Sequence, residues 1–496
     1  MQQKSILVMP LQISGGHFTF RSICLGLVLL SVLSGTRALA QPNFVLILSD
    51  DHGAADSGAY GNNRIQTPNL DKLASQGIRF DAAFATEAIC TPSRSSLYTG
   101  LYPMRHGAHR NHTEVFEGTL SLPHYFEPMG YQVLLAGKTH IGPSDAFPFS
   151  KVSASGSLFS AKSIDNYLPA MEDVFNSNQP FLLVVATSLP HTLLVGEPYP
   201  ESDRYRADDI ELPPYLVNTQ QTRQNRAGYY ELVTQLDSEV GKVVTALDTS
   251  AAADNTVVIY ASDHGAGFAF EKWTNYDAGI RVPLIVRLPQ HTLAGHNSEA
   301  LVSLVDVLPT MLALANADAP ADIDGRSFAA VLQDPSRKHR DYVFATHTTL
   351  GIRNAKDAMP IRTIRNARFK YIRNLNPEGT LSNNVTEQTQ SGWPSWIQAA
   401  MSGDTFAASR IKAYQHRPAE ELYSLEADPF ELNNVVNNPG YGSMLPNLRA
   451  TLDIEMSRQN DEGLAAPYTE SNLGFVVNTL LEINVAWKKF KNMLNF

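Results

Sequence analysis

Of the two cysteines in the sequence, only Cys90 stands among other residues suited to catalysis. It begins the segment Cys90-Thr-Pro-Ser-Arg-Ser-Ser-Leu-Tyr-Thr-Gly100, in which Arg94 supplies a permanent positive charge. Cys24 lies in an apolar N-terminal run, so the rest of the chain has one thiol and can form no internal disulfide. A buried, inert cysteine is the ordinary explanation for such a residue. The neighbours of Cys90 favour a chemical role instead.

Acidic residues follow two apolar segments that the sequence predicts to be buried strands. Asp50 and Asp51 come directly after the first of these strands, and Asp263 and His264 follow a later one. Carboxyl ends of neighbouring parallel strands meet at one edge of a sheet, so these four side chains can converge on one hard cation. Oxygen donors favour calcium or magnesium over zinc, and the imidazole of His264 adds a nitrogen that calcium binds less readily.

Lysine and histidine residues complete the candidate site. Lys138 and His140 lie in Gly137-Lys-Thr-His140, just past a predicted strand. A lysine and a histidine at a strand end can hold an anion such as sulfate and move protons. His191 ends the segment Ser188-Leu-Pro-His, and Lys272 lies in Glu271-Lys-Trp-Thr-Asn-Tyr. Neither His191 nor Lys272 is informative in isolation.

The elements that must position these residues alternate between strands and helices, which is typical of a mainly parallel sheet covered by helices. The sequence predicts strands at 44–48, 131–135, 181–185 and 256–260, and helices starting at Thr67-Pro68, over 122–129 and over about 226–247. Polar residues repeatedly follow the carboxyl ends of these strands, where open α/β sheets build their binding sites. We therefore assign residues 41–340 to a catalytic α/β domain.

The pattern of predicted strands and helices changes after about Ser336. Shorter strands are predicted at 342–346 and 361–372, a loop at 381–392 and a helix at 445–458, while 475–496 has a helical pattern with lysines near its end. We assign residues 341–496 to a smaller α+β subdomain with an antiparallel sheet, packed on the first.

The first forty residues are typical of an export signal. Lys4 and Arg21 precede the apolar run 23–33, and Ala38-Leu-Ala40 offers small residues for cleavage. The run is much shorter than the roughly 20 residues needed to span a bilayer. We expect an exported protein, periplasmic or secreted, with no membrane association after signal removal. The formal net charge of −10 argues against a broad nucleic-acid-binding surface, and no pattern indicates an oligomeric state.

The segment from Cys90 to Gly100 resembles the signature of the type I, formylglycine-dependent sulfatases, Cys-x-Pro-x-Arg followed by an apolar pair, Thr and Gly. Tyr98 stands where that family more often has an aliphatic residue. A second family signature is present as Gly130-Tyr-Gln-Val-Leu-Leu-Ala-Gly-Lys-Thr-His140. Segments 137–143, 360–376 and 421–430 are most similar to the sulfamidase (N-sulfoglucosamine sulfohydrolase) branch. The resemblance implies an alkaline-phosphatase-like sandwich, with a large mainly parallel sheet flanked by helices and a smaller C-terminal part.

The resemblance also implies the chemistry. A maturation enzyme oxidises the cysteine to formylglycine, whose hydrate offers one hydroxyl as nucleophile and one to expel sulfate. The implied metal ligands, for Ca²⁺ or alternatively Mg²⁺, are Asp50, Asp51, Cys90, Asp263 and His264. The implied catalytic groups are Cys90, Arg94, Lys138, His140, His191 and Lys272. Among these, His191 would protonate the leaving group and His140 would remove the proton of the second hydroxyl.

These observations predict a sulfohydrolase that acts on a sulfated saccharide in the manner of a sulfamidase. Three alternatives remain open. The first is an O-sulfatase acting on a sulfated algal polysaccharide or a glycosaminoglycan, and the second is a phosphonate monoesterase or phosphodiesterase of the same superfamily. The third is a non-enzymatic protein that binds sulfated glycans and keeps Cys90 unconverted.

Overall fold

The first strand of the described chain, β1 (Asn43–Asp50), lies in the middle of a large sheet because it is apolar on both faces. Phe44, Leu46 and Leu48 pack into one buried cluster, whereas Val45 and Ile47 pack into another on the opposite side. A strand that is apolar on both faces needs helices on both sides of its sheet. The computed structural model describes residues 41–154, 163–192, 198–348, 358–387 and 391–463. The predicted signal segment 1–40 and the predicted tail helix 475–496 lie outside the described residues.

Within this described part of the chain, the large sheet has eight strands in the order β5-β4-β6-β1-β7-β8-β2-β9. The strands β5, β4, β6, β1 and β7 are parallel, and β8 runs antiparallel to both of its neighbours. The strands besides β1 are β2 (Ile78–Phe80), β4 (Gln132–Gly137), β5 (Ser150–Lys151), β6 (Phe181–Pro190), β7 (Thr256–Ser262), β8 (Leu284–Arg287) and β9 (His296–Ser298). A two-stranded sheet pairs β3 (Ala83–Phe84) with β10 (Val302–Ser303).

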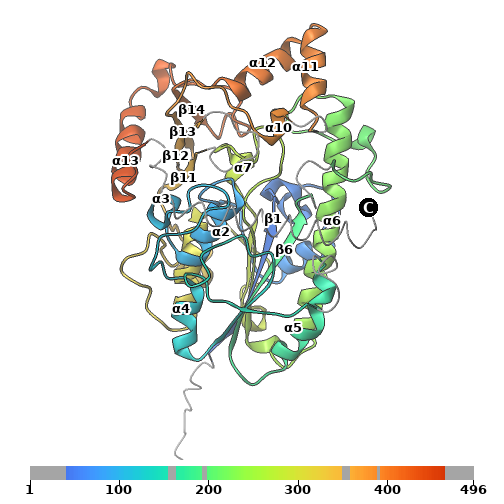
Figure 1. Ribbon diagram of the computed structural model, residues 1–496, viewed down its shortest axis with the longest axis vertical. Coiled ribbons are helices and arrows are strands. Elements are labelled where there is room, and N and C mark those ends of the chain that lie inside the picture. The colour runs from blue at the N-terminus through green and yellow to red at the C-terminus, as the bar shows by residue number, and fades with distance from the viewer. Residues whose placement is uncertain (1–40, 155–162, 193–197, 349–357, 388–390, 464–496) are drawn as a thin grey trace, which may run out of the picture. The chain divides into compact units, whose positions relative to one another are not determined.

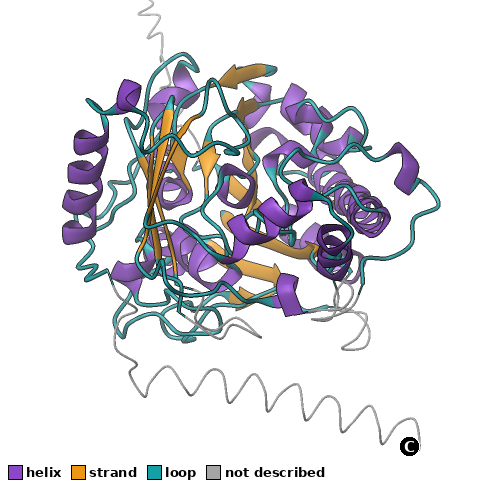
Figure 2. Cartoon of the chain, turned by 90° about the horizontal axis from the view of Figure 1, so that it is seen from above, coloured by secondary structure: helices purple, strands orange, loops and turns teal. Residues whose placement is uncertain are grey.

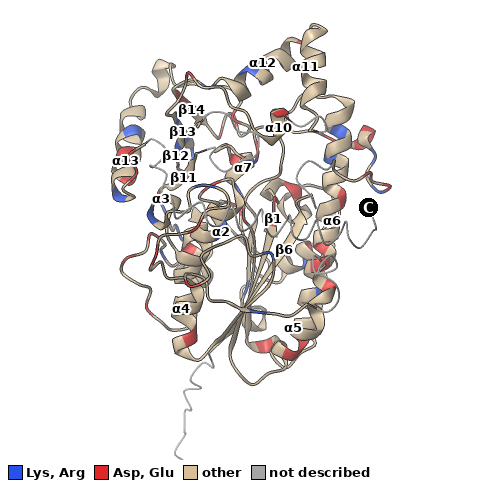
Figure 3. Cartoon of the chain, viewed as in Figure 1, with Lys and Arg blue, Asp and Glu red and all other residues tan. Residues whose placement is uncertain are grey.

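Helices cover both faces of the large sheet, as Figures 1 and 2 show. One face packs against α2 (Cys90–Thr99), α4 (Leu122–Phe126), α8 (Val307–Leu314) and α9 (Ala329–Gln333). The other packs against α1 (Pro68–Ser75), α5 (Leu168–Phe175) and α6 (Gln220–Asp248). Short helices α3 (Pro103–His106) and α7 (Asp277–Ile280) lie in loops. The central strands of the large sheet carry few charges along their length, whereas α13 carries both signs (Figure 3).

A second sheet follows residue 340. It is antiparallel and, among the described residues, has four strands: β11 (Val343–His347), β12 (Ile361–Arg365), β13 (Phe369–Asn374) and β14 (Glu420–Ser424). Its helices are α10 (Asn384–Glu387), α11 (Trp393–Met401), α12 (Thr405–Gln415) and α13 (Leu445–Arg458). The prediction of a large mainly parallel sheet and a smaller antiparallel one is confirmed. No helix in the described ranges is both long and apolar enough to cross a membrane.

The structure corrects two local predictions in this second part. The segment 361–372 was predicted as one strand but forms the hairpin β12–β13, because the side chain of Asn366 accepts hydrogen bonds from the backbone amides of Arg368 and Phe369 and turns the chain. The predicted loop 381–392 contains the short helix α10, whose start is capped by Asn383 through the amide of Val385.

Candidate active site

The carboxyl ends of β1 and β7 lie side by side, and this places the two acidic pairs together. The strands are parallel and in register up to Ser49 and Ser262, so Asp50 and Asp263 leave the sheet at the same point. Asp51 adopts a left-handed conformation (φ 72°), and its amide donates to Oδ1 of Asp263 at 3.1 Å. The turn after β1 is therefore folded onto the turn after β7.

Helix α2 brings Cys90 to this edge as its first residue, and every residue of the helix is buried. Two of its polar side chains, those of Ser93 and Arg94, are held by hydrogen bonds to Asp263, the residue that follows β7. Ser93 Oγ donates to the carbonyl of Asp263 at 2.6 Å, and Arg94 Nε donates to Oδ2 of Asp263 at 2.9 Å. Gly100, in the left-handed conformation that glycine favours, ends the helix. These contacts fix the first turn of α2 against the two acidic turns.

Four potential ligands meet at this point. One ligand atom each from Asp50, Cys90, Asp263 and His264 lies within 4.8 Å of the other three, and all four side chains are buried. Cys90 Sγ donates to Oδ1 of Asp50 at 3.4 Å and lies 3.3 Å from Nε2 of His264. Asp51 is adjacent, with Oδ1 3.6 Å from Nδ1 of His264. Buried carboxylates around one point suit a hard divalent cation, so this donor set fits the predicted metal.

Three cations surround the three carboxylates. Lys138 Nζ bonds Oδ2 of Asp50, and Lys272 Nζ bonds Oδ1 of Asp51 at 2.7 Å. The ammonium of Lys272 also lies 3.7 Å from Cys90 Sγ. Arg94 completes the set with its pair to Asp263 and a 3.6 Å contact to Oδ1 of Asp50. Lys138, Lys272 and Arg94 thus equal the three carboxylates in number, and an added divalent cation would leave an excess of positive charge.

This environment shifts the pKa values of the buried groups. Burial would raise the pKa of Asp50, but the positive charges of Lys138, Arg94 and Lys272 outweigh it and hold that pKa well below its usual range. Burial and the Asp50 carboxylate would raise the pKa of the Cys90 thiol, yet the two lysines lower it to about 6. Position 90 therefore sits where an anion is stabilised.

The two predicted histidines lie at the more open side of the cluster. The Nδ1 atom of His191 lies 2.6 Å from the carbonyl of Thr192. His140 Nε2 lies 2.7 Å from Nδ1 of His112, a residue that the sequence did not single out. The side chain of Lys138 is 18% exposed, compared with 4% for Lys272, so the cluster is more open to solvent at Lys138 than at Lys272. No direct contact joins His140 or His191 to Cys90 among the hydrogen bonds of the described residues.

The loop that carries Lys272 is supported by the second sheet. Asn275 Nδ2 donates to the carbonyl of Ala345 at 3.2 Å and to the hydroxyl of Thr363 at 3.1 Å. Lys370, buried in β13, donates to the carbonyl of Asn275 at 3.0 Å. The small sheet therefore holds one wall of the candidate site, although its own residues lie far along the sequence.

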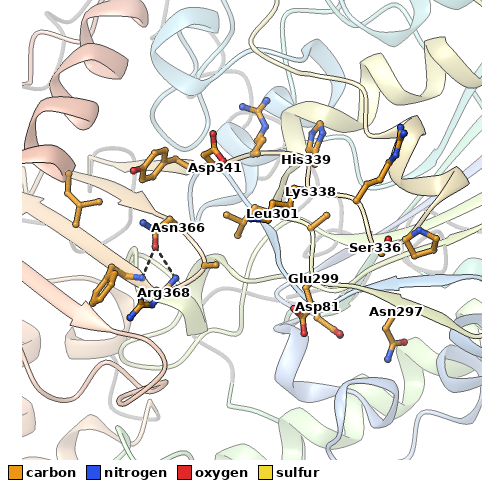
Figure 4. A pocket seen from close by; sticks show the side chains of 18 of the residues that line it. Asp81, Asn297, Glu299, Leu301, Ser336, Lys338, His339, Asp341, Asn366 and Arg368 are labelled. Atoms are coloured by element: carbon orange, nitrogen blue, oxygen red, sulfur yellow. Dashed lines mark hydrogen bonds between the residues drawn. The ribbon is translucent and has the colours of Figure 1, made fainter. Parts of the chain in front are cut away.

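A separate groove of about 830 Å³ lies between the edge of the large sheet and the β12–β13 turn (Figure 4). Asp81, Asn297 and Arg368 are among the residues that line it, and none of the predicted site residues does. A cavity of about 150 Å³ adjoins the candidate site instead, with Lys138, Tyr167 and Glu239 in its wall.

Comparisons with known proteins agree with this geometry. Residues 42–317 match the family model described as sulfatase, and residues 264–381 match N-sulphoglucosamine sulphohydrolase, C-terminal. An ulvan-active sulfatase of Formosa agariphila is 34% identical over 442 residues, which cover 87% of this chain and 83% of that protein. Human N-sulphoglucosamine sulphohydrolase is 28% identical over 469 residues, which cover 86% of this chain and 92% of the human protein.

Solved structures show the same fold at lower identity. A sulfatase from Bacteroides thetaiotaomicron superposes with a TM-score of 0.63 at 22% identity and covers 85% of this chain and 93% of its own. The phosphonate monoester hydrolase of Agrobacterium radiobacter superposes with a TM-score of 0.65 at 20% identity, over 87% and 99% of the two chains. The alkaline-phosphatase-like fold and the similarity to the sulfamidase branch are thereby confirmed. This chain belongs to the sulfatase family.

Proposed function

We propose that this protein is a formylglycine-dependent sulfohydrolase that removes sulfate esters from a sulfated polysaccharide. The observation that carries this proposal is the convergence of Asp50, Cys90, Asp263 and His264 within 4.8 Å of one another, flanked by Lys138 and Lys272. The two lysines and Arg94 offset the three carboxylates, so a divalent cation would create the positive excess that an anionic sulfate ester requires.

The cofactors would contribute in two ways. Asp50, Asp51, Asp263 and His264 would hold the divalent cation, with Ca²⁺ first and Mg²⁺ second because most of the donors are carboxylate oxygens. The hydrated aldehyde formed from Cys90 would supply an oxygen nucleophile, and the cation would favour its ionised form.

The side chains of this chain have separable tasks. Lys272 and Lys138 lie on two sides of position 90 and offset charge on the sulfate oxygens. Arg94 pairs with Asp263, and its guanidinium also faces Asp50. It therefore fixes the position of the nucleophile relative to these two carboxylates. The Nδ1–H of His191 donates to a carbonyl, which can only accept. The imidazolium form of His191 would therefore give its second proton, on Nε2, to the departing oxygen.

The class of substrate rests on the relatives. A protein named as ulvan-active sulfatase is 34% identical to this chain, compared with 28% for the human sulphohydrolase of N-sulfoglucosamine. We therefore place O-sulfated polysaccharide of the ulvan type first. Sulfamidase activity is the second candidate, which the match of residues 264–381 supports. We further propose that the protein acts after export, as a periplasmic or secreted enzyme.

Two measurements test the proposal. Mass analysis of the peptide containing position 90 distinguishes an aldehyde from a thiol after co-expression with a formylglycine-generating enzyme. Sulfate release is then measured from ulvan oligosaccharides, N-sulfoglucosamine and an aryl sulfate, with an aryl phosphonate monoester as the competing class and Cys90→Ala as the inactive control. Preferential hydrolysis of the phosphonate, or no sulfate release from material that carries the aldehyde, would contradict the proposal.

A further inference from the structure

A buried arginine on α6, Arg226, joins the two chain segments whose side chains meet at the candidate site. Its Nη1 donates to Oε1 and Oε2 of Glu271 at 3.0 and 3.2 Å, and its Nη2 donates to Oδ1 of Asp56. Glu271 directly precedes Lys272 in the loop after β7, and Asp56 lies in the segment after β1 that begins with Asp51. One guanidinium therefore bridges the segment of a predicted metal ligand and the loop of a predicted sulfate-binding lysine.

Aromatic rings confine this guanidinium. The rings of Tyr229 and Phe268 have their centroids 5.0 and 4.9 Å from its central carbon. The hydroxyl of Tyr229, one turn further along α6, lies 3.0 Å from the carbonyl of Asp51 and 3.3 Å from Oδ2 of Asp56. A guanidinium is planar and its N–H donors point in fixed directions, so in this confined position it holds the two carboxylates at one separation.

The backbone at both ends of the Lys272–Asp51 ion pair needs such support. Phe270 and Trp273, which flank Lys272 and the residue before it, have left-handed conformations with φ of 66° and 63°. Asp51 has φ of 72°. Bulky residues rarely adopt this conformation, which persists only where surrounding contacts hold it. The contacts of Arg226 lie within these two strained segments.

The position of the Lys272 ammonium depends on the separation of the two segments. Its Nζ lies 2.7 Å from Oδ1 of Asp51 and 3.7 Å from Cys90 Sγ. We propose that Arg226 is a positioning residue that fixes the ammonium of Lys272 beside position 90, where it binds a sulfate oxygen of the substrate. This inference rests on the proposed sulfatase function. The Asp51 turn keeps two hydrogen bonds that do not involve Arg226, from its amide to Asp263 and from Tyr229 to its carbonyl. Loss of the guanidinium should therefore displace mainly the loop that carries Lys272.

A double-mutant cycle with Lys272 separates positioning from a general structural role. Arg226→Lys keeps the charge, but one ammonium cannot reproduce the fork that reaches both carboxylates. We expect kcat of the aldehyde-bearing enzyme to fall about 10–100-fold in Arg226→Lys, as for a misplaced binding group. In a Lys272→Met background the same substitution should lower kcat by at most about threefold more, because the side chain that Arg226 positions is already absent. An equal loss in both backgrounds, or an unchanged kcat in Arg226→Lys, would overturn the proposal.

Arg287→Lys is the matched control. Arg287 is also 2% exposed and also joins two elements, through Asp248 at 2.8 Å and Gln76 at 3.2 Å. It lies opposite Val258 near the start of β7, whereas the candidate site follows the end of that strand. We expect Arg287→Lys to lower the melting temperature, as Arg226→Lys does, but to leave kcat within about threefold of wild type. If both variants lower kcat equally, general loosening of the fold explains the effect and the positioning role is wrong.

Binding of inorganic sulfate to the Ca²⁺-loaded protein is a readout that does not depend on turnover. Calorimetry should show about tenfold weaker sulfate binding in Arg226→Lys, the loss of roughly one charged hydrogen bond, and unchanged binding in Arg287→Lys. If Arg226→Lys does not fold, Glu271→Gln takes its place in both measurements, because it removes one acceptor of the guanidinium and keeps the shape of the side chain; unchanged kcat and sulfate affinity would then sink the inference. If the aldehyde-bearing wild type releases no sulfate from any substrate while sulfate binding follows the expected pattern, the proposed function fails and the positioning role of Arg226 stands.

Discussion

Replacing Lys272 with methionine separates the role of its charge from the role of its packing. The side chain is buried, and Nζ lies 2.7 Å from Oδ1 of Asp51. At an effective dielectric constant of about 20, that separation corresponds to an attraction of about 6 kcal/mol, of which desolvation offsets part. Removing one partner of a buried pair typically costs about 3–5 kcal/mol, because the other charge is left uncompensated.

The structure makes this cost depend on the metal. Asp51 is a predicted ligand, so a bound divalent cation would compensate its charge in place of Lys272. We expect Lys272→Met to lower the melting temperature strongly in the presence of a chelator and much less with saturating Ca²⁺. Turnover should nevertheless fall about 10²–10³-fold even with Ca²⁺, since the ammonium 3.7 Å from Cys90 Sγ is lost as a stabiliser of developing charge.

The assay is thermal unfolding with and without Ca²⁺, together with sulfate release from the best substrate. Lys242→Met is the matched control, because Lys242 pairs with Asp165 at the surface, where both side chains are about half exposed and such pairs contribute at most about 1 kcal/mol. If Lys272→Met lowers the melting temperature equally with and without Ca²⁺, the predicted metal position beside Asp51 is refuted. Turnover within tenfold of wild type would refute the charge role of Lys272.

Two further outcomes follow from buried ionisable groups. Burial opposes the charged form of His264, but the Asp263 carboxylate raises its pKa to about 9, so Ca²⁺ binding must displace a proton. Ca²⁺ affinity measured by calorimetry should rise between pH 7 and 9 in wild type and stay flat in His264→Asn; a flat wild-type profile would contradict this. Burial would raise the pKa of Asp306, yet Arg340 and His339 lower it to about 2 from 3.8. Its ionised form therefore contributes about 2 kcal/mol of stability that is complete above pH 3.8 and lost as pH falls through about 2. Asp306→Asn should lose this pH dependence in denaturant titrations, and an unchanged profile would show that another group is responsible.

The sequence predicted those helices and strands whose own residues show a clear apolar or periodic pattern. The apolar run in β1, the long periodic helix α6 and the helix α13, found at 445–458 as predicted, are specified by their own residues. The hairpin β12–β13 was missed because apolar and basic residues keep alternating through its turn. The pair Trp393 and Trp396, which starts α11, is apolar without a long periodic pattern, so α11 was not predicted.

The candidate site was predictable where family signatures mark it. Asp50, Cys90, Asp263 and His264 were predicted as metal ligands from their positions after strands and in the motif, and the fold brings them together. His112 gave no such signal. It stands 28 residues before His140 in sequence, and only the packing of the loop on α2 brings the two rings together.

The hydrogen bonds that Asn275 donates to Ala345 and Thr363 and accepts from Lys370 have a consequence for engineering and for divergence within the family. The C-terminal part therefore cannot be exchanged without affecting the loop that carries Lys272. A chimaera could carry the small sheet of another sulfatase in order to alter the saccharide preference. We expect such a replacement to displace Lys272, which lies beside position 90, unless residues 271–277 are replaced together with the sheet.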